Sequence, residues 1–117
     1  MSNERLREKM KRQLSTILEF EVRDPVIKRS LSTVTEVKLS RDARYARVYI
    51  AVGEAGEDRA AVLKVFNRDS GFFRSKLAAR LQVRYTPELR FILDETFDKA
   101  RRMEQLLQTE QDEISSD

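Results

Sequence analysis

The side chains of this 117-residue chain that could take part in chemistry are mostly cationic. The chain contains 23 Lys and Arg residues and 20 Asp and Glu residues, but neither cysteine nor histidine. This composition excludes disulfide scaffolds, zinc sites built on thiolate or imidazole, and Cys–His or Ser–His–Asp catalysis. Carboxylate chemistry with magnesium or a lysine nucleophile remains, and neither has a recognisable motif. We therefore expect no catalytic residue, metal or cofactor, and a chain that acts by binding.

The positive charge is segregated along the chain. All Lys and Arg residues lie at or before Arg102, so residues 1–103 hold 23 basic and 15 acidic side chains, a net charge of +8. A basic globule with an acidic tail fits a polyanionic partner, although a solvated surface that happens to be basic has the same composition. Arginine outnumbers lysine sixteen to seven. This ratio favours nucleic acid, because a guanidinium group can grip phosphate with two hydrogen bonds.

Two sets of cations stand out by their spacing. The first shares one face of a predicted sheet, where Lys38, Arg47 and Arg90 alternate with Tyr45 and Tyr49. Arginine between tyrosines can neutralise phosphates and stack on bases, but exposed strands carry the same pattern for cross-strand packing alone. The second set lies along the predicted helices on either side of a glycine. Together with the turn between the strands, these sets give the predicted RNA contacts Lys38, Arg41, Arg44, Arg47, Lys64, Arg68, Arg74, Lys76, Arg80 and Arg84.

Hydrophobic periodicity predicts the elements that position these side chains. Apolar residues at helical spacing predict a helix over 4–22, which Asp24-Pro25 ends. Alternation at period two predicts strands over 31–40 and 44–52, joined as an antiparallel hairpin. In the first strand we expect one face to carry Leu31, Thr33, Thr35, Val37 and Leu39.

The second half of the chain returns to helical spacing and then to a strand. A helical pattern over 57–68 resumes after Gly71 and runs to residue 81. The strand predicted over 86–94 is reached through this helical crossover, so it should pair in parallel and make the sheet mixed. Residues 95–107 predict a short helix, and residues 108–117 an acidic, disordered tail.

Gly71 interrupts an apolar pattern that otherwise keeps its phase. A glycine inside a helix costs roughly 0.5–1 kcal/mol relative to alanine. We expect it to mark a kink between two helices, with Asp69 or Ser70 capping the second. One uninterrupted helix that tolerates a glycine is the alternative. A kink formed by Asp69, Ser70 and Gly71 would let an RNA backbone approach closely.

Four stretches resemble one family of bacterial proteins. They are RDP at 23–25, LSRDARYARVYIAV at 39–52, SGFFRSKLAARLQVRYTPELRF at 70–91 and ARRMEQLL at 100–107, and they resemble ribosome-binding factor A in order and separation. The resemblance implies an α+β chain with one type II KH-like domain over residues 1–107. The implied order is α-β-β-α-kink-α-β, with a three-stranded mixed sheet, helices on one face and a short C-terminal helix. In place of the G-x-x-G loop of KH domains the family has an Ala-x-Gly kink, so Asp69 here replaces its alanine.

The resemblance also implies a function. It is that of a non-enzymatic assembly factor that binds the free small (30S) ribosomal subunit and 16S rRNA and assists late rRNA maturation, notably in the cold. No apolar run approaches the roughly 18 residues of a membrane span, and the N-terminus lacks a secretory or transit signal, so we expect a cytoplasmic protein. We also expect a monomer without a small-molecule substrate.

Other readings of the sequence stay open. One is a KH-like protein that binds other RNA, and another is a protein-binding adaptor that uses its first or its C-terminal helix. A magnesium-dependent nuclease built on Asp24, Asp42 or Asp94 lacks a supporting cluster of residues.

Overall fold

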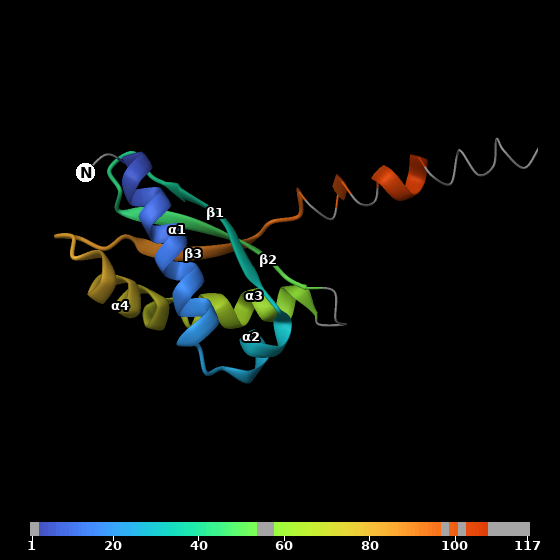
Figure 1. Ribbon diagram of the computed structural model, residues 1–117, viewed down its shortest axis with the longest axis horizontal. Helices are drawn as coiled ribbons and strands as arrows, with labels where there is room; N and C mark the ends of the chain where they lie inside the picture. The colour runs from blue at the N-terminus through green and yellow to red at the C-terminus, as the bar shows by residue number, and fades with distance from the viewer. Residues whose placement is uncertain (1–2, 54–57, 97–98, 101–102, 108–117) are drawn as a thin grey trace, which may run out of the picture.

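The computed structural model describes residues 3–53, 58–96, 99–100 and 103–107 (Figure 1). Its elements follow the predicted order, with one helix added after the first. They are α1 (Asn3–Phe20), α2 (Pro25–Ser30), β1 (Thr33–Leu39), β2 (Tyr45–Ala51), α3 (Arg59–Arg68), α4 (Ser70–Leu81) and β3 (Glu88–Leu93). The predicted α+β order is therefore confirmed.

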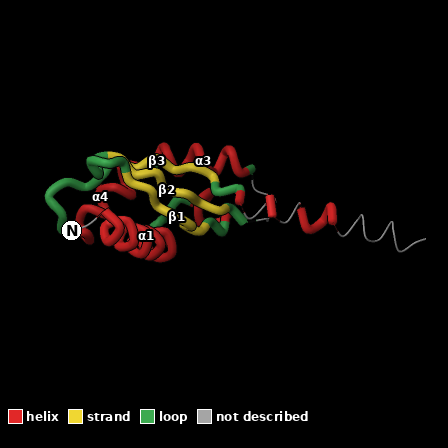
Figure 2. Tube along the Cα trace, turned by 90° about the horizontal axis from the view of Figure 1, so that it is seen from above, coloured by secondary structure: helices red, strands yellow, loops and turns green. Residues whose placement is uncertain are grey.

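The sheet has the strand order β1-β2-β3, with β1 antiparallel and β3 parallel to the central strand β2. The predicted mixed sheet is thus confirmed. Figure 1 shows α1 crossing the strands with α3 and α4 beneath them, and in Figure 2 the strands lie in front of α3. One face of the sheet is buried under these helices through Val37, Val48, Ile50 and Phe91. The residues that alternate with these along the strands lie on the other face, which is more exposed and polar. Antiparallel strands commonly have one such face open to solvent.

The first strand does not alternate as its sequence predicts. Val34 and Val37 are both buried, whereas Thr33 and Leu31 are exposed. The register with β2 shifts between Val34 and Glu36, which marks a β-bulge. Because of the extra residue, the buried side chains of Val34 and Val37 are three residues apart and not two. The predicted shared face of Leu31, Thr33, Thr35, Val37 and Leu39 is therefore wrong.

The helix α2 was not predicted. Asp24 is its N-cap, with one carboxylate oxygen accepting a 2.9 Å hydrogen bond from the amide of Val26, and Pro25 occupies the first turn. Asp24-Pro25 therefore ends one helical segment and begins the next. The helix closes on Leu31 in the left-handed conformation, with φ 51°. A Cβ on Gly53 would lie 2.9 Å from the Leu31 Cβ, so this packed turn requires a glycine there.

The predicted division into two helices is confirmed, but the break lies at Asp69 and not at Gly71. Asp69 has φ −93° and ψ 13°, between the last residue of α3 and the first of α4. Gly71 lies in the first turn of α4, with nothing within 4 Å of the position that a Cβ would occupy. Phe66 and Phe73 stack across the break at 5.7 Å between ring centroids. Both rings also contact Phe91 of β3, which fixes the two helices on the sheet.

The predicted C-terminal helix is described only in part. Residues 103–107 are helical, and their side chains Met103, Leu106 and Leu107 are exposed. Residue 97, which the prediction placed in this helix, and the predicted tail over 108–117 lie outside the described residues. The domain boundary at residue 107 stays a prediction.

Candidate nucleic-acid interface

Three cations lie side by side across the uncovered face of the sheet. Lys38 of β1 is the register partner of Arg47 in β2, and Arg47 is the register partner of Arg90 in β3. All three side chains are exposed, and among the described residues none of them forms an ion pair. We call Lys38, Arg47 and Arg90 the cation row. Like charges directly opposite each other on neighbouring strands destabilise a sheet, so this arrangement favours a bound polyanion.

The residues around the cation row limit where an anion can lie. Tyr49 partners Glu36, and the amine of Lys38 lies 5.3 Å from the centroid of the Tyr49 ring. Tyr45 partners Glu88 in the neighbouring row. The two glutamates therefore lie on either side of the cation row. The positive charge on this face is thus confined to the row itself, which runs across the three strands.

The turn between β1 and β2 presents further cations at one end of the sheet. Asp42 shapes this turn by accepting hydrogen bonds from the Ser40 hydroxyl at 2.8 Å and the Arg44 amide at 3.1 Å. The Ser40 hydroxyl and then the Arg44 amide hold the pKa of Asp42 below its usual value. The Arg44 guanidinium lies 3.9 Å from the Asp42 carboxylate, with both side chains largely exposed. Such a pair is weak, so Arg44 stays accessible to another anion.

This turn is tied to the loop that precedes β3. The amide of Glu88 donates a 2.9 Å hydrogen bond to the carbonyl of Arg44. Figure 1 shows both segments at the left end of the molecule. Arg41, Arg44 and Arg84 therefore lie at the same end of the sheet, and each is exposed.

The cations at the break between α3 and α4 divide into two kinds. Lys64 is exposed, and the Lys76 amine lies 5.8 Å from the centroid of the exposed Phe72 ring. Arg68, in contrast, pairs with Asp24 at 2.5 Å and with Asp69 at 3.1 Å. Asp69 in the first place, and Asp24 after it, raise the pKa of the Arg68 guanidinium. Asp69 makes no side-chain cap hydrogen bond to α4, so the predicted capping by this residue is wrong.

Arg74 and Arg80 face the protein itself. The Nε and Nη2 groups of Arg74 donate to the carbonyl of Thr86 at 3.1 and 2.9 Å. Arg80 donates to Gln13 at 3.1 Å and to Glu21 at 2.9 Å, both in or next to α1. These two predicted RNA contacts therefore have internal partners, and the exposed cations Lys38, Arg41, Arg44, Arg47, Lys64, Lys76 and Arg84 are the stronger candidates.

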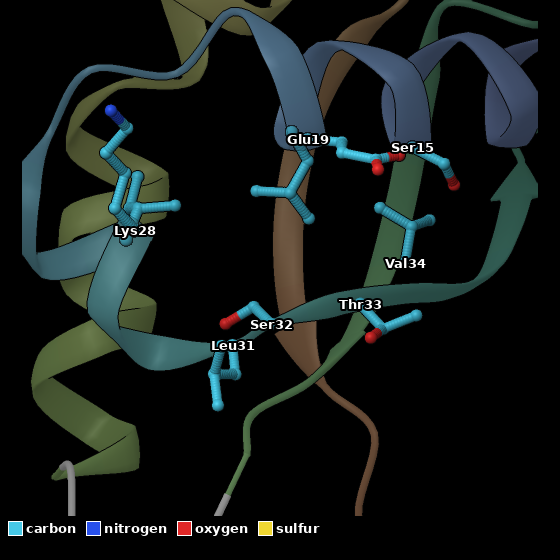
Figure 3. Close-up of a pocket in the computed structure, with 9 residues that line it drawn as sticks. Ser15, Glu19, Lys28, Leu31, Ser32, Thr33 and Val34 are labelled. Carbon is cyan, nitrogen blue, oxygen red and sulfur yellow. The ribbon is translucent and has the colours of Figure 1, made fainter. Parts of the chain in front are cut away.

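A groove of about 490 Å³ lies beside the start of β1. It runs between the second half of α1 and the segment from α2 into β1, with side chains such as Ser15, Lys28 and Thr33 around it (Figure 3). Its lining includes Leu18, Ile27, Leu31, Val34 and the carboxylate of Glu19. Lys28 is the one cation among these lining residues, so the groove does not extend the positive surface.

The carboxylates considered for a nuclease lie in three separate settings. Asp24 caps α2 and binds Arg68, and Asp42 shapes the hairpin turn. Asp94 accepts a 2.6 Å hydrogen bond from the Thr35 hydroxyl. The described residues contain no group of three or more side chains that could hold a metal ion. In the same part of the chain, no helix is long and apolar enough to cross a membrane.

A sequence profile described as "Ribosome-binding factor A" matches residues 2–107. The chain belongs to the ribosome-binding factor A family. It is 36% identical over 104 residues to the ribosome-binding factor A of Acetivibrio thermocellus, covering 89% of this chain and 84% of that one. The resemblance seen in the sequence is confirmed.

A crystal structure and a fitted model of relatives in this family share the fold. The crystal structure of ribosome-binding factor A from Thermus thermophilus aligns with a TM-score of 0.69 and 26% identity, over 79% of this chain and 94% of that one. The second is a homology model of the Thermus thermophilus factor, fitted into a cryo-EM map of a 30S–RbfA complex. It aligns with a TM-score of 0.62 and 28% identity, over 76% of this chain and 91% of that one.

Two further candidate side chains were not among the predicted RNA contacts. Arg90 was placed on the correct face of the sheet, but only the parallel register of β3 puts it directly beside Arg47. The other is Tyr85, which lies half exposed in the loop before β3, against Arg74. Its neighbour Arg84 in the sequence was the available signal, because cations beside aromatics are typical of nucleic-acid surfaces.

Proposed function

We propose that this chain is a non-enzymatic assembly factor that binds the free small (30S) ribosomal subunit through 16S rRNA and assists late rRNA maturation, including in the cold. Membership of the ribosome-binding factor A family supports the proposal, as does the relative whose coordinates were fitted into a 30S complex. The proposal includes a monomer in the cytoplasm that takes no small-molecule substrate or cofactor.

The observation that carries the proposal is the cation row. Lys38, Arg47 and Arg90 are register partners on a sheet face that no described helix covers. Their mutual repulsion is relieved when phosphates lie along them, so the folded protein is arranged to receive a polyanion of extended shape. Arg41, Arg44 and Arg84 extend this positive surface past the end of the sheet.

Binding alone is sufficient for the proposed role. A protein that binds one arrangement of rRNA more tightly than another shifts the population towards the first, by as much as the two affinities differ. The bound factor would favour the mature local fold of 16S rRNA and would leave once that surface is completed. No covalent step is required of any residue.

Sedimentation with purified small subunits tests the proposal at the cation row. Arg47→Glu should weaken binding by at least about tenfold, because it places an anion between two remaining cations. Lys11→Glu makes the same charge change at an exposed position of α1 and should leave binding close to that of the wild type. If the Arg47→Glu variant and the wild type bind equally well, the cation row is not part of the interface.

The choice of partner and the role in maturation need separate measurements. In a lysate the protein should sediment with free small subunits and not with joined ribosomes. Short unrelated RNAs should compete poorly with small subunits, whereas a binder of other RNA would show the opposite order. Cells that lack the protein should accumulate unprocessed 16S rRNA, more strongly at low temperature than at high temperature.

A further inference from the structure

Tyr85 is held in a fixed position although half of its surface is exposed. It lies in the loop between α4 and β3, at the left end of Figure 1, and its exposed fraction is 50%. The loop starts at Gln82, which closes α4 in the left-handed conformation with φ 53°. Arg74 donates two hydrogen bonds to the carbonyl of Thr86, at 3.1 and 2.9 Å. The loop is therefore tied to α4 on both sides of Tyr85.

The same arginine supports the ring of Tyr85. The Arg74 Cζ atom lies 5.5 Å from the ring centroid, which is a cation–π contact. Because its guanidinium is already bonded to Thr86, Arg74 cannot follow the ring if the ring moves. Among the described residues no other aromatic side chain contacts the Tyr85 ring. Arg74 therefore supports one side of the Tyr85 ring, and the rest of the ring is exposed to solvent.

The surroundings of the ring suit a nucleotide. Arg84 is exposed directly beside it in the chain, and Arg41 and Arg44 lie at the same end of the sheet through the hydrogen bond from Glu88 to Arg44. An aromatic ring for the base and nearby cations for the phosphates are the two parts of a single-strand binding site. A base inside a duplex is already stacked on both faces, so the ring favours an unpaired base.

We propose that Tyr85 is a stacking platform for one unpaired nucleobase of RNA, with Arg74 as the positioning residue that fixes the ring. The inference rests on the proposed function, because it names the form of RNA that this end of the molecule accepts. Stacking tolerates any base, so the platform selects single-stranded RNA without selecting a sequence.

The chain contains no tryptophan, which gives a direct optical test. Tyr85→Trp introduces a single tryptophan whose fluorescence a stacked base quenches. We expect saturable quenching by an unstructured RNA of about twelve nucleotides. An abasic strand of the same length should not quench, although it has the same phosphates. Phe20→Trp is the matched control, because Phe20 is 74% exposed as the last residue of α1 and, among the described residues, no cation supports its ring as Arg74 supports Tyr85, so it should not be quenched.

Binding affinities give a second readout. Tyr85→Ala should weaken binding of the same RNA about tenfold, whereas Tyr85→Phe should bind like the wild type because the ring is kept. The proposed platform is wrong if Tyr85→Ala binds this RNA as tightly as the wild type does, or if the abasic strand quenches the Tyr85→Trp variant. It is also wrong if the wild type fails to bind the single strand.

The small subunit separates this inference from the proposed function. If all variants still sediment with small subunits but single-stranded RNA does not quench the Tyr85→Trp variant, the platform is wrong and the proposed function stands. If the wild type fails to sediment with small subunits, the proposed function is wrong as well.

Discussion

At the residue scale, Arg80 acts within the fold. Its guanidinium joins α4 to Gln13 and to Glu21, with about a third of each ionic side chain exposed. The second oxygen of Glu21 is buried and has no hydrogen-bond partner among the described residues. Arg80→Ala should lower the free energy of unfolding by about 1–2 kcal/mol, because it leaves a half-buried carboxylate unpaired. Urea denaturation measures the change.

A double-mutant cycle isolates this pair. In a Glu21→Ala background, Arg80→Ala should cost less than in the wild type, because the partner is already gone. Equal costs in both backgrounds would show that Arg80 acts independently of Glu21. Binding to small subunits should change little in any variant that remains folded.

Asp94 gives a prediction about pH. The hydrogen bond from Thr35, and after it those from Thr96, hold the pKa of Asp94 below its usual value. Because the folded pKa lies below the unfolded one, this stabilisation is complete above about pH 4 and is lost as the pH falls through the folded pKa. Thr35→Val should therefore be less stable than the wild type near neutral pH, and the difference should shrink in acid. Unfolding measured across the acid range checks this.

Asp94→Asn supplies the control for the same experiment. Asparagine does not titrate, so in that background the effect of Thr35→Val should not depend on pH in the acid range. A difference that shrinks equally in both backgrounds would assign the pH dependence to another group.

At the element scale, the two described glycines have opposite roles. A methyl group on Gly71 would meet nothing within 4 Å, whereas on Gly53 it would lie 2.9 Å from the Leu31 Cβ and 3.1 Å from the Ser30 carbonyl. Gly71→Ala should raise the free energy of unfolding by up to about 0.5–1 kcal/mol, and Gly53→Ala should lower it. Thermal denaturation of both variants tests the contrast.

Gly71→Ala also tests the break between α3 and α4 as an RNA contact. A more stable variant that binds small subunits less tightly would mean that the glycine serves a partner's close approach. Unchanged binding would mean that no partner approaches there. Ala78→Gly, at an exposed position of α4, is the control that should lose stability without losing affinity.

Much of the fold could be predicted because its elements have clear periods. The strands around Val48 and Phe91 alternate, and α1 repeats every three or four residues. The six residues of α2 are too few to show a helical period, although Asp24-Pro25 was a usable start signal. The bulge in β1 depends on pairing with β2, which a single strand does not reveal.

The candidate site was less predictable for a related reason. A basic residue looks the same in the sequence whether its partner is RNA or its own chain. Glu21 is 59 residues from Arg80, and no local pattern connects them. The cation row likewise depends on the parallel register of β3 with β2.

At the scale of the whole molecule, charge should dominate binding. Neutralising the cation row with Lys38→Gln, Arg47→Gln and Arg90→Gln removes up to three phosphate contacts. The slope of log affinity for small subunits against log salt concentration should then flatten by roughly two to three units. The same triple variant should unfold at a slightly higher temperature, because repulsion across the sheet is gone. Sedimentation at several salt concentrations and a thermal melt provide both values.

Neutral substitutions elsewhere provide the comparison. Changing Lys9, Lys11 and Lys28 of α1 and α2 to glutamine removes the same charge without touching the sheet face. An equal loss of slope in both triple variants would mean that net charge, and not the cation row, sets the affinity.

The parallel pairing of β2 with β3 has a consequence for how the chain reaches its native state. Tyr45 pairs with Glu88, and α3 and α4 lie between them in the sequence. During synthesis the hairpin of β1 and β2 can close early, but the third strand can dock only after both intervening helices have been made. The cation row is completed by this last strand, so a partly made chain would lack Arg90 and could not yet grip RNA across the whole sheet.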